Sequence, residues 1–391
     1  MSFNTVTNIS VIFEYNVFRL IKETSKGKAR LGEIRTDHGT IPTPIFMPVG
    51  TVGTVKAVDT STLTDRIGAP IILGNTYHLY LRPGTSIMEQ AGGLHAFMNW
   101  PGALLTDSGG YQVFSLSEIR KLEEDGVVFK SHLDGSSHKF TPSQVVETQR
   151  IFGSDIMMVL DECPPYPATE SYVRQSLDLT HRWAAQCLQA FRSSPDRYGH
   201  RQFLFGICQG GVFPELRRHS VEVLSGMGFD GMAIGGLSVG EPAAKMYEIT
   251  DICTDLLPRE KPRYLMGVGT PGDLLESVAR GVDMFDCVMP TRNARNGMLF
   301  TRNGIINVKN ARWKSHFAPA DEGFPSDLCS RHTMAYVHHL FRAGEILGIQ
   351  LATVHNLTFY LWLMDEIRRH IRDDTYADWY PGMAEKVTSR V

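Results

Sequence analysis

The sequence predicts a (β/α)₈ barrel, an α/β fold in which parallel strands alternate with helices around a closed sheet. Two observations indicate it. Eight short apolar runs recur between residues 45 and 289, and helical patterns lie between several of them. Apolar strands that alternate with helices indicate a parallel sheet covered by helices. Eight runs in about 250 residues fit a closed barrel better than an open doubly wound sheet.

Residues 1–43 are expected to form antiparallel strands before the barrel. Apolar and polar residues alternate in Val11–Tyr15 and Val17–Ile21, and glycine-containing segments follow at Lys26–Arg30 and Asp37–Thr40. A period of two is typical of strands with one buried face, and the glycines mark turns between them.

The eight apolar runs are the expected barrel strands. Each is short, as strands between crossover helices usually are. They are Ile45–Val49, Pro70–Leu73, Ala103–Leu105, Asp155–Leu160, Phe203–Ile207, Met232–Ile234, Tyr264–Met266 and Met284–Phe285.

Helices with recognisable starts lie between several of these runs. Thr141 and Thr270 each precede a proline, so that a threonine caps the helix and the proline takes its first position. Longer helical patterns cover residues 171–191 and 214–227.

The pattern changes after residue 298. Residues 299–308 are expected to form a hairpin turning at Asn303–Gly304, residues 310–329 an inserted loop, and residues 332–347 and 356–372 two helices. No repeat or linker marks a second domain. We divide the single domain, 1–391, into N-terminal strands (1–43), the main part of the barrel (44–298), an insertion (299–355) and a C-terminal helix completing the barrel (356–391).

The composition is that of an ordinary globular protein, with 42% hydrophobic and 21% charged residues. The formal charge of −3 leaves nucleic-acid binding open, because basic residues can gather on one face. No run approaches the ~18 apolar residues of a membrane span, and no signal-peptide pattern opens the sequence. These two absences predict no membrane partner. The six cysteines lie singly without a CxxC pair, which favours reduced thiols and a cytoplasmic location.

Polar and otherwise unusual residues lie at or near the carboxyl ends of the predicted strands. In a (β/α)₈ barrel all these ends open on one face, where the catalytic loops gather. Their shared placement therefore predicts an active site and makes the single domain a catalytic one. The residues are Asp107, Asp161, Gln209, Gly235, Gly236, Met266 and Asp286.

Asp107 and Asp286 on one rim suggest glycosyl transfer. One carboxylate can attack an anomeric carbon while the other transfers protons, as in retaining glycosidases. Taken alone, an aspartate such as Asp286 is more simply explained as capping a turn or pairing with Arg292.

The neighbouring residues suit a flat, polar ligand. Asp161 and Gln209 can pair with the edge of a purine-like base, and the glycine backbone allows close approach. Tyr111 and Met266 provide faces on which a ring can stack. Each of these residues alone is more often simply solvated or part of a core.

Six stretches carry a resemblance to a known family. They are TDSGGYQVFS (106–115), FKSHLDGSSHKFTP with the downstream LDECPPYP (129–167), GICQGG (206–211), AIGGLSVGE (233–241), YLMGVGTP (264–271) and DMFDCVMPTRNARNG (283–297). These stretches resemble the queuine tRNA-ribosyltransferases, also called tRNA-guanine transglycosylases, from about Gly27 to near the C-terminus. The resemblance implies a (β/α)₈ barrel that exchanges the wobble guanine of certain tRNAs for a 7-deazaguanine base in queuosine biosynthesis.

The resemblance also implies residue roles. Asp286 matches the nucleophile that forms a covalent aspartyl-ribosyl RNA intermediate. Asp107 matches the general acid/base that protonates the departing guanine and deprotonates the incoming base. No cofactor is needed for this chemistry, because the enzyme ester conserves the energy of the glycosidic bond. The positions expected to bind the base are Asp161, Gln209, Gly236, Leu237, Tyr111, Met266, Ser108 and Gly235.

The expected partners are the anticodon loop of tRNA, guanine and the incoming 7-deazaguanine base. The target nucleotide would be turned out of its stack, and nearby cations would bind the phosphates. Arg292 and Arg295 match basic residues beside the nucleophile. Arg312 and Lys314 near the insertion are further candidates, although solvated surface charge explains these two equally well.

The insertion departs from the family, in which three cysteines and a histidine hold a structural zinc. Cys329 matches the third cysteine and His355 the histidine, but Phe324 and Ser326 replace the other two ligands. Phenylalanine cannot ligate zinc and serine rarely does. We therefore predict that the chain carries no structural zinc and that packing alone holds the insertion.

The resemblance bears on the base and on assembly too. Cys163 and Val239 match the bacterial type of pocket, which favours the small 7-aminomethyl-7-deazaguanine. Enzymes that take the larger queuine have glycine at the position of Val239, so queuine stays the alternative. Tyr336 and His339 match dimer-contact positions, while His332 replaces an aromatic residue of the family. A homodimer is expected.

Other classes of protein share parts of this pattern. A retaining glycosidase acting on sugars would have the two carboxylates but would lack the Asp161–Gln209 pair. A non-catalytic partner subunit would keep the barrel and lose the nucleophile. A metal-dependent hydrolase would cluster histidines at the strand ends, where only His78 is conspicuous and is more simply a structural histidine.

Overall fold

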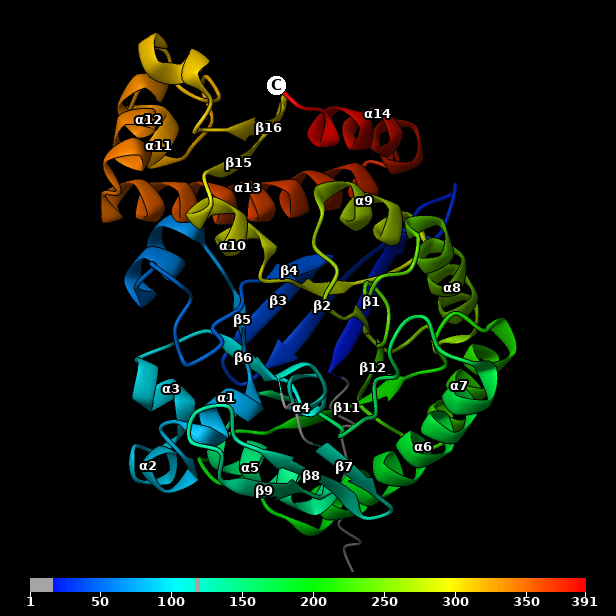
Figure 1. Cartoon of the computed structure of the whole chain (residues 1–391). Helices are drawn as coiled ribbons and strands as arrows, with labels where there is room; N and C mark the ends of the chain where they lie inside the picture. The colour runs from blue at the N-terminus through cyan, green and yellow to red at the C-terminus, as the bar shows by residue number, and fades with distance from the viewer. Residues whose placement is uncertain (1–16, 117–119) are drawn as a thin grey trace, which may run out of the picture.

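The computed structural model describes residues 17–116 and 120–391 and contains the predicted barrel (Figure 1). The eight barrel strands are β4 (Ile45–Met47), β5 (Ile71–Gly74), β6 (Ala103–Thr106), β10 (Ile156–Met158), β11 (Phe203–Cys208), β12 (Gly231–Ile234), β13 (Arg263–Leu265) and β14 (Met284–Asp286). Their order in the sheet is β4-β14-β13-β12-β11-β10-β6-β5. The edge strands β4 and β5 meet through a parallel bridge between Val49 and Leu73. Each strand corresponds to one predicted apolar run.

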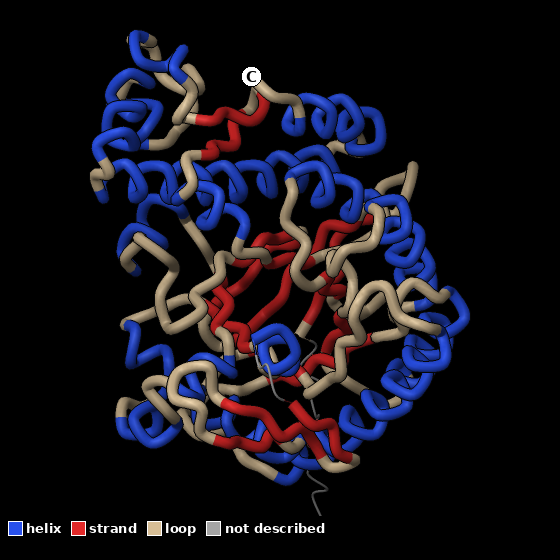
Figure 2. Tube along the Cα trace, in the orientation of Figure 1, coloured by secondary structure: helices blue, strands red, loops and turns tan. Residues whose placement is uncertain are grey.

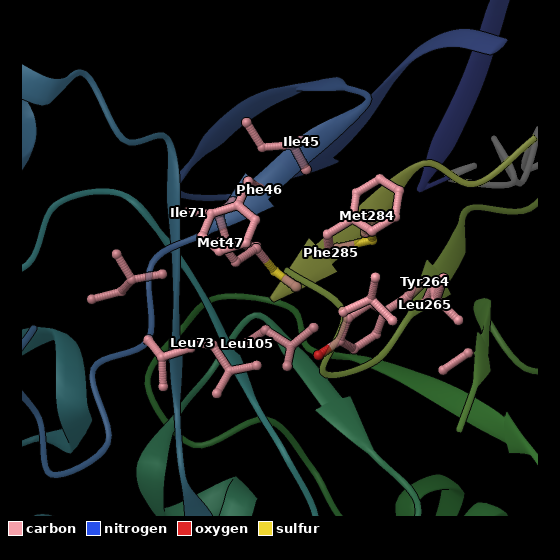
Figure 3. Close-up of a cluster of buried hydrophobic side chains, with 14 of the residues drawn as sticks. Ile45, Phe46, Met47, Ile71, Leu73, Leu105, Tyr264, Leu265, Met284 and Phe285 are labelled. Carbon is pink, nitrogen blue, oxygen red and sulfur yellow. The ribbon is translucent and has the colours of Figure 1, made fainter. Parts of the chain in front are cut away.

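Buried hydrophobic side chains of the barrel strands pack together (Figure 3). Phe46, Met47, Leu105, Met284 and Phe285 have no exposed surface. Strands in this position are buried on both faces, by the barrel interior and by the outer helices, which explains why the runs are continuous rather than alternating. Burial of each such side chain contributes roughly 1.5–3 kcal/mol.

Helices follow the strands and cover the barrel. Thr141 and Thr270 cap α5 and α9 as predicted: their hydroxyls accept from the backbone N–H of Gln144 at 3.2 Å and of Asp273 at 3.1 Å. The helices up to residue 295 are α1 (Thr76–Leu81), α2 (Thr85–Gln90), α3 (Gly93–Met98), α4 (Gly110–Leu116), α5 (Pro142–Phe152), α6 (Glu170–Ser193), α7 (Pro214–Ser225), α8 (Ala243–Leu256), α9 (Pro271–Ala279) and α10 (Met289–Arg295), together with a short π-helical turn, Thr62–Ile67.

A three-stranded antiparallel sheet lies between β6 and α5 and was not predicted. It comprises β7 (Arg120–Glu123), β8 (Gly126–Lys130) and β9 (Ser137–Phe140), the strands at the bottom of Figure 2. These strands are short, and the large apolar side chains buried in them are those of Val127, Phe129 and Phe140. Because their stability comes from contacts with the barrel, their own sequence carries little periodic signal.

The N-terminal strands close the amino end of the barrel. They are β1 (Phe18–Glu23), β2 (Arg30–Thr36) and β3 (Gly39–Thr43), antiparallel as predicted. The expected strand at residues 11–15 lies outside the described residues. The buried guanidinium of Arg30 lies 3.2 Å from Asp283 Oδ2, which also accepts from the backbone N–H of Arg263 at 2.8 Å. Since Asp283 directly precedes β14, this contact ties the sheet to the barrel.

The region after residue 298 contains the predicted hairpin and more helix than expected. The two-residue turn is Arg302–Asn303, one residue earlier than predicted. The predicted boundaries of helices 332–347 and 356–372 are wrong. The first helix ends at Gly344, which has a left-handed backbone conformation, and the second begins ten residues earlier than predicted. The elements are β15 (Met298–Thr301), β16 (Gly304–Asn307), a 3₁₀ turn (Ala311–Ser315), α11 (Asp327–Arg331), α12 (Met334–Ala343), α13 (Ile346–Arg372) and α14 (Tyr376–Thr388).

Helix α13 crosses one side of the barrel and separates it from the insertion (Figure 1). It packs against β4, α10 and β15. In the described part of the chain it is the one helix whose length and composition would suffice for a membrane span, and 61% of that stretch is buried inside the protein. A mostly buried helix of this kind belongs to the core of the fold.

Candidate active site

Asp107 lies directly after β6 and is almost completely buried. Its Oδ2 accepts from Asn75 Nδ2 at 2.5 Å and its Oδ1 from the backbone N–H of Thr76 at 2.8 Å. Burial raises the pKa of Asp107 to about 6; these hydrogen bonds lower it, and the charge of Asp286 raises it further. The two carboxylates therefore interact across the mouth of the barrel, as the predicted pair requires.

Asp286 ends β14 and presents its two carboxylate oxygens differently. Oδ1 accepts from the Tyr264 hydroxyl at 2.6 Å and from the backbone N–H of Gly267 at 2.9 Å. Burial raises the pKa of Asp286, while these two donors lower it. No ion pair with Arg292 forms among the described residues. Oδ2 has no hydrogen-bond donor in the same part of the chain, so one oxygen is held and the other is free to react.

Asp161, Gln209 and Ser108 meet in a second buried cluster at the same end of the barrel. Gln209 Nε2 donates to Asp161 Oδ2 at 2.7 Å, and Ser108 Oγ donates to Oδ1 at 3.4 Å. Burial raises the pKa of Asp161 to about 6, although the hydrogen bond from Gln209 lowers it. Gln209 Oε1 is buried without a partner in the described structure. An unpaired buried acceptor beside a carboxylate suits a ligand with several N–H donors.

Gly235 and Gly236 pack directly against Gln209. A β-carbon on Gly236 would lie 2.2 Å from Gln209 Oε1, and one on Gly235 would lie 2.8 Å from Nε2. Gly236 also has φ +65°, in the left-handed region that favours glycine. Glycine is needed here because the amide of Gln209 occupies the space that a side chain would take.

The residues predicted to stack on a base lie at the edge of this cluster. Tyr111 is 48% exposed, and Met266 directly after β13 is half-buried. Burial and the neighbouring Cys163 raise the pKa of Tyr111, while Arg292 lowers it, so these residues share one neighbourhood. Leu237 is buried next to Gly236.

The predicted basic residues fall into two groups. Arg292 and Arg295 on α10 have no carboxylate partner among the described residues, and the Nη1 atom of Arg295 is buried without a hydrogen bond. Burial and the charge of Arg292 lower the pKa of Arg295. Two close, unpaired guanidiniums fit a bound anion. By contrast, Arg312 packs over the ring of Trp313 at 4.3 Å, and its guanidinium donates to the carbonyl of Val391.

Several supporting residues were not identified from the sequence. Asn75, Thr76 and Tyr264 orient the carboxylates of Asp107 and Asp286. Arg217 on α7 is fully buried and donates to the carbonyls of Cys208 and Gly211, both at 2.8 Å, on either side of Gln209. Asn75 and Thr76 directly follow β5, so the rule that strand ends carry the site could have found them. Arg217 and Tyr264 lie within regular elements and give no such signal.

The insertion does not fit the tetrahedral zinc site of the family. Nδ1 of His355 lies 2.8 Å from Ser326 Oγ and 3.6 Å from Cys329 Sγ, and its Nε2 lies 2.9 Å from the carbonyl of Phe300. The buried ring of Phe324 contacts the imidazole edge-on, with 5.4 Å between centroids. Only one thiol and one imidazole are available, and an aromatic ring fills the remaining space.

Comparison with known proteins agrees with this arrangement. A family model described as queuine tRNA-ribosyltransferase matches residues 25–389. Proteins named queuine tRNA-ribosyltransferase are similar along most of the chain: that of Caldanaerobacter subterraneus subsp. tengcongensis is 57% identical over 94% of this chain and 97% of its own length. Those of Halothermothrix orenii and Bacillus velezensis are 52% and 51% identical over 95% and 94% of this chain, and over 98% and 95% of their own lengths. The chain therefore belongs to the queuine tRNA-ribosyltransferase family, the tRNA-guanine transglycosylases.

Proposed function

We propose that this transglycosylase exchanges the wobble guanine of tRNA for 7-aminomethyl-7-deazaguanine through a covalent aspartyl-ribosyl RNA intermediate. Asp286 is the nucleophile and Asp107 the general acid/base. The observation that carries the proposal is the pair of buried, electrostatically coupled carboxylates beside the Asp161–Gln209 cluster. This cluster distinguishes the site from that of a sugar-hydrolysing glycosidase.

In the first step, Oδ2 of Asp286 attacks C1′ of the ribose. The glycosidic bond breaks, its electron pair goes to guanine, and Asp107 supplies the proton that the departing base needs. Tyr264 and Gly267 hold Oδ1, so that the carboxylate keeps one orientation during the attack. Guanine leaves before its replacement enters, and only a covalent bond retains the RNA in between.

In the second step, the incoming base loses a proton to Asp107 and attacks C1′ from the side that guanine left. The ester bond breaks and Asp286 is regenerated. A pKa of about 6 suits Asp107 to this double role, because both protonation states are accessible near neutral pH. The reaction is a balanced exchange and requires no nucleoside triphosphate.

The pocket supports a small substituent on the incoming base. Cys163 is buried, and burial raises the pKa of its thiol, so the side chain stays neutral. Val239 lies in the loop after Gly236, and Glu241 accepts from its backbone N–H at 3.0 Å. Both positions match pocket positions of the bacterial type, where these side chains would leave room for a small substituent, and queuine with its larger substituent is the alternative substrate.

The central experiment measures incorporation of labelled guanine into tRNA by wild type and by Asp286→Ala. Wild type should incorporate guanine and form an RNA adduct that survives denaturation, whereas Asp286→Ala should do neither. Asp378→Ala is the control, because its carboxylate is 73% exposed on α14. Equal incorporation by wild type and Asp286→Ala would overturn the assignment of the nucleophile.

A second experiment tests the choice of base. Wild type should use 7-aminomethyl-7-deazaguanine and leave queuine largely unused, and Val239→Gly should gain activity with queuine. If wild type prefers queuine in direct competition, the proposed substrate is wrong while the exchange chemistry stands.

We also propose that the enzyme works in the cytoplasm as a homodimer. Large apolar side chains are exposed together on the insertion and the start of α13, as an interface would require. They are Phe317 (78% exposed), Ile346 (76%), Leu347 (41%) and Tyr336 (40%). Sedimentation of the purified protein would show a dimer; a monomer at micromolar concentration would contradict it.

The insertion, in this proposal, carries no zinc. Its core is built by Phe324, by the hydrogen bond between Ser326 and His355, and by the buried Cys329. Burial lowers the pKa of His355 to about 4, so the imidazole is neutral at physiological pH and can hydrogen-bond without carrying a charge.

A further inference from the structure

Three histidines and an aspartate form a cluster at the amino end of the barrel. His38 lies in the turn between β2 and β3, His95 in α3 and His200 in the loop before β11; Figure 1 labels these four elements. Asp155 directly precedes β10 and is fully buried. One potential ligand atom from each imidazole lies within 4.8 Å of those of the other two. The active site follows the opposite ends of these strands, so the cluster is separate from it.

Hydrogen bonds determine which nitrogen of each ring is left free. Nδ1 of His95 lies 3.2 Å from the carbonyl of Trp100, and Nε2 of His200 lies 2.8 Å from that of Gly153. Nδ1 of His38 faces the buried carboxylate at 2.8 Å. Carbonyl and carboxylate oxygens only accept, so these nitrogens carry the protons of the neutral rings. Nε2 of His38, Nε2 of His95 and Nδ1 of His200 then bear lone pairs.

This arrangement is that of metal-binding histidines, which donate their other ring N–H to a carbonyl or carboxylate and so gain a fixed orientation. His95 adds a second indication. Its Nε2 is buried without a hydrogen bond, although it lies 3.3 Å from Asp155 Oδ2. A nitrogen lone pair beside a carboxylate oxygen is unfavourable, and a positive charge at this position, carried by a proton or by a metal ion, removes the repulsion.

The surrounding structure holds the cluster in place and leaves it accessible. Arg201 donates to Asp37 at 2.6 Å, which joins the two loops that carry His200 and His38. The side chains of His38 and His95 are 23% and 13% exposed, so an ion can enter from solvent. These two rings stack 3.7 Å apart. Ligand nitrogens around a tetrahedral ion lie about 3.4 Å apart, which is close to the spacing of these two rings. Because stacked rings point their lone pairs in parallel directions, one ring must turn before the lone pairs of His38 and His95 can both point at the ion.

We propose that His38, His95 and His200 bind a divalent transition-metal ion of the imidazole-preferring class, with Zn²⁺ as the natural occupant. Asp155 orients His38 and water completes the coordination. The ion would join the β2–β3 turn, α3 and the loop before β11 at the amino end, where barrel residues usually serve stability. This proposal departs from the prediction, made from the sequence, that the chain carries no structural zinc, because that prediction considered only the ligands of the insertion.

Cobalt binding to tag-free, chelator-treated protein tests the proposal. One Co²⁺ per chain should bind and give visible d–d absorption without the near-ultraviolet thiolate-to-cobalt band, because none of the ligands is a thiolate. His95→Ala and His200→Gln should each weaken binding by at least about 100-fold. Zn²⁺ should raise the Tm of wild type by a few degrees and leave both variants unchanged.

Two control variants locate the ion. His219→Ala removes an exposed histidine on α7, and Cys329→Ser removes the one thiol near His355; both should retain wild-type binding. Guanine exchange should be unaffected in His95→Ala and His200→Gln, because the cluster and the active site lie at opposite ends of the barrel. Absence of one-to-one cobalt binding, or a thiolate band that Cys329→Ser abolishes, would overturn the proposal.

Discussion

At the scale of single residues, the active site keeps carboxylates where burial disfavours their charge. Asp107, Asp161 and Asp286 all have raised pKa values, and burial is the largest cause for each. A folded-state pKa above the unfolded one means that the folded protein binds more protons, so stability falls as pH rises through this range. These residues therefore serve catalysis and binding at a cost to stability near neutral pH.

Asp107→Asn should separate these two effects. The ordinary pKa of 3.8 rises to about 6 on folding, so the destabilisation is absent below pH 3.8 and complete above pH 6. It amounts to at most about 3 kcal/mol. We expect exchange activity to fall at least about 100-fold. The Tm of the variant relative to wild type should improve from pH 4 to pH 7.

Thermal melts across this pH range, beside an exchange assay, check both effects. A relative Tm that does not change with pH would show that Asp107 is not the strained carboxylate that its environment indicates.

Gly236→Ala should weaken base binding without removing the catalytic groups. The new β-carbon would lie 2.2 Å from Gln209 Oε1, so the amide must move and lose its geometry toward Asp161. We expect KM for the base to rise at least about 10-fold, with a smaller effect on kcat. Gly344→Ala is the matched control: it also has positive φ, but no atom lies within 4 Å of its β-carbon. A wild-type KM in Gly236→Ala would contradict the assigned role of Gln209.

At the scale of elements, the short helix α10 brings cations near Asp286, the proposed nucleophile. Pro290 in its first turn starts the helix directly after β14, and Arg292 and Arg295 follow in its last turn. Asn356 on α13 donates to the carbonyls of Pro290 and Met298, both at 3.0 Å, and so fixes both ends of this segment. The position of the arginines is therefore determined by α13, far along the sequence.

Arg292→Ala should weaken tRNA binding mainly through phosphate contacts. We expect log Kd to depend less steeply on log salt concentration, with the slope reduced by about 1. Exchange at saturating tRNA should be less affected. Arg174→Ala on α6, an exposed arginine paired with Glu170, should leave the slope unchanged. Equal slopes for wild type and Arg292→Ala would exclude a phosphate contact there.

The proposal that the insertion holds no metal can be tested by adding the two missing zinc ligands. The double variant Phe324→Cys with Ser326→Cys places two thiols beside Cys329 and His355, which completes four possible zinc ligands. Cobalt should then give an intense thiolate-to-cobalt band that wild type lacks. If wild type already shows this band, the proposal that the insertion is free of metal is wrong.

At the scale of the whole molecule, long-range contacts cover the amino end and one side of the barrel. The sheet of β1–β3 covers the amino end, and α13 packs along β4 from the other end of the sequence. The ion pair between Arg30 and Asp283 connects the sheet of β1–β3 to the barrel, and both side chains have almost no exposed surface.

Arg30→Ala should lower the free energy of unfolding by about 3–5 kcal/mol, because it leaves Asp283 buried with less compensation. The matched control is Arg259→Ala, whose exposed ion pair with Glu23 should contribute at most about 1 kcal/mol. Denaturant unfolding of both variants measures the difference, and similar losses in the two would contradict the role assigned to Arg30.

The sequence by itself determined the barrel and the rim on which the candidate site residues lie. Fully apolar runs identified all eight strands, because strands buried on both faces need no polar residues. Parallel strands end on one face, so Asp107 and Asp286 could be assigned to the same rim from the sequence alone.

Only the tertiary structure decided how these groups are held. Tyr264 acts through a contact with the neighbouring strand, and the strands β7–β9 depend on the barrel for their burial. His38, His95 and His200 are separated by more than fifty residues at each step, so no local spacing could bring them together. Periodicity reports which face of an element is buried; it does not report which distant side chain meets it there.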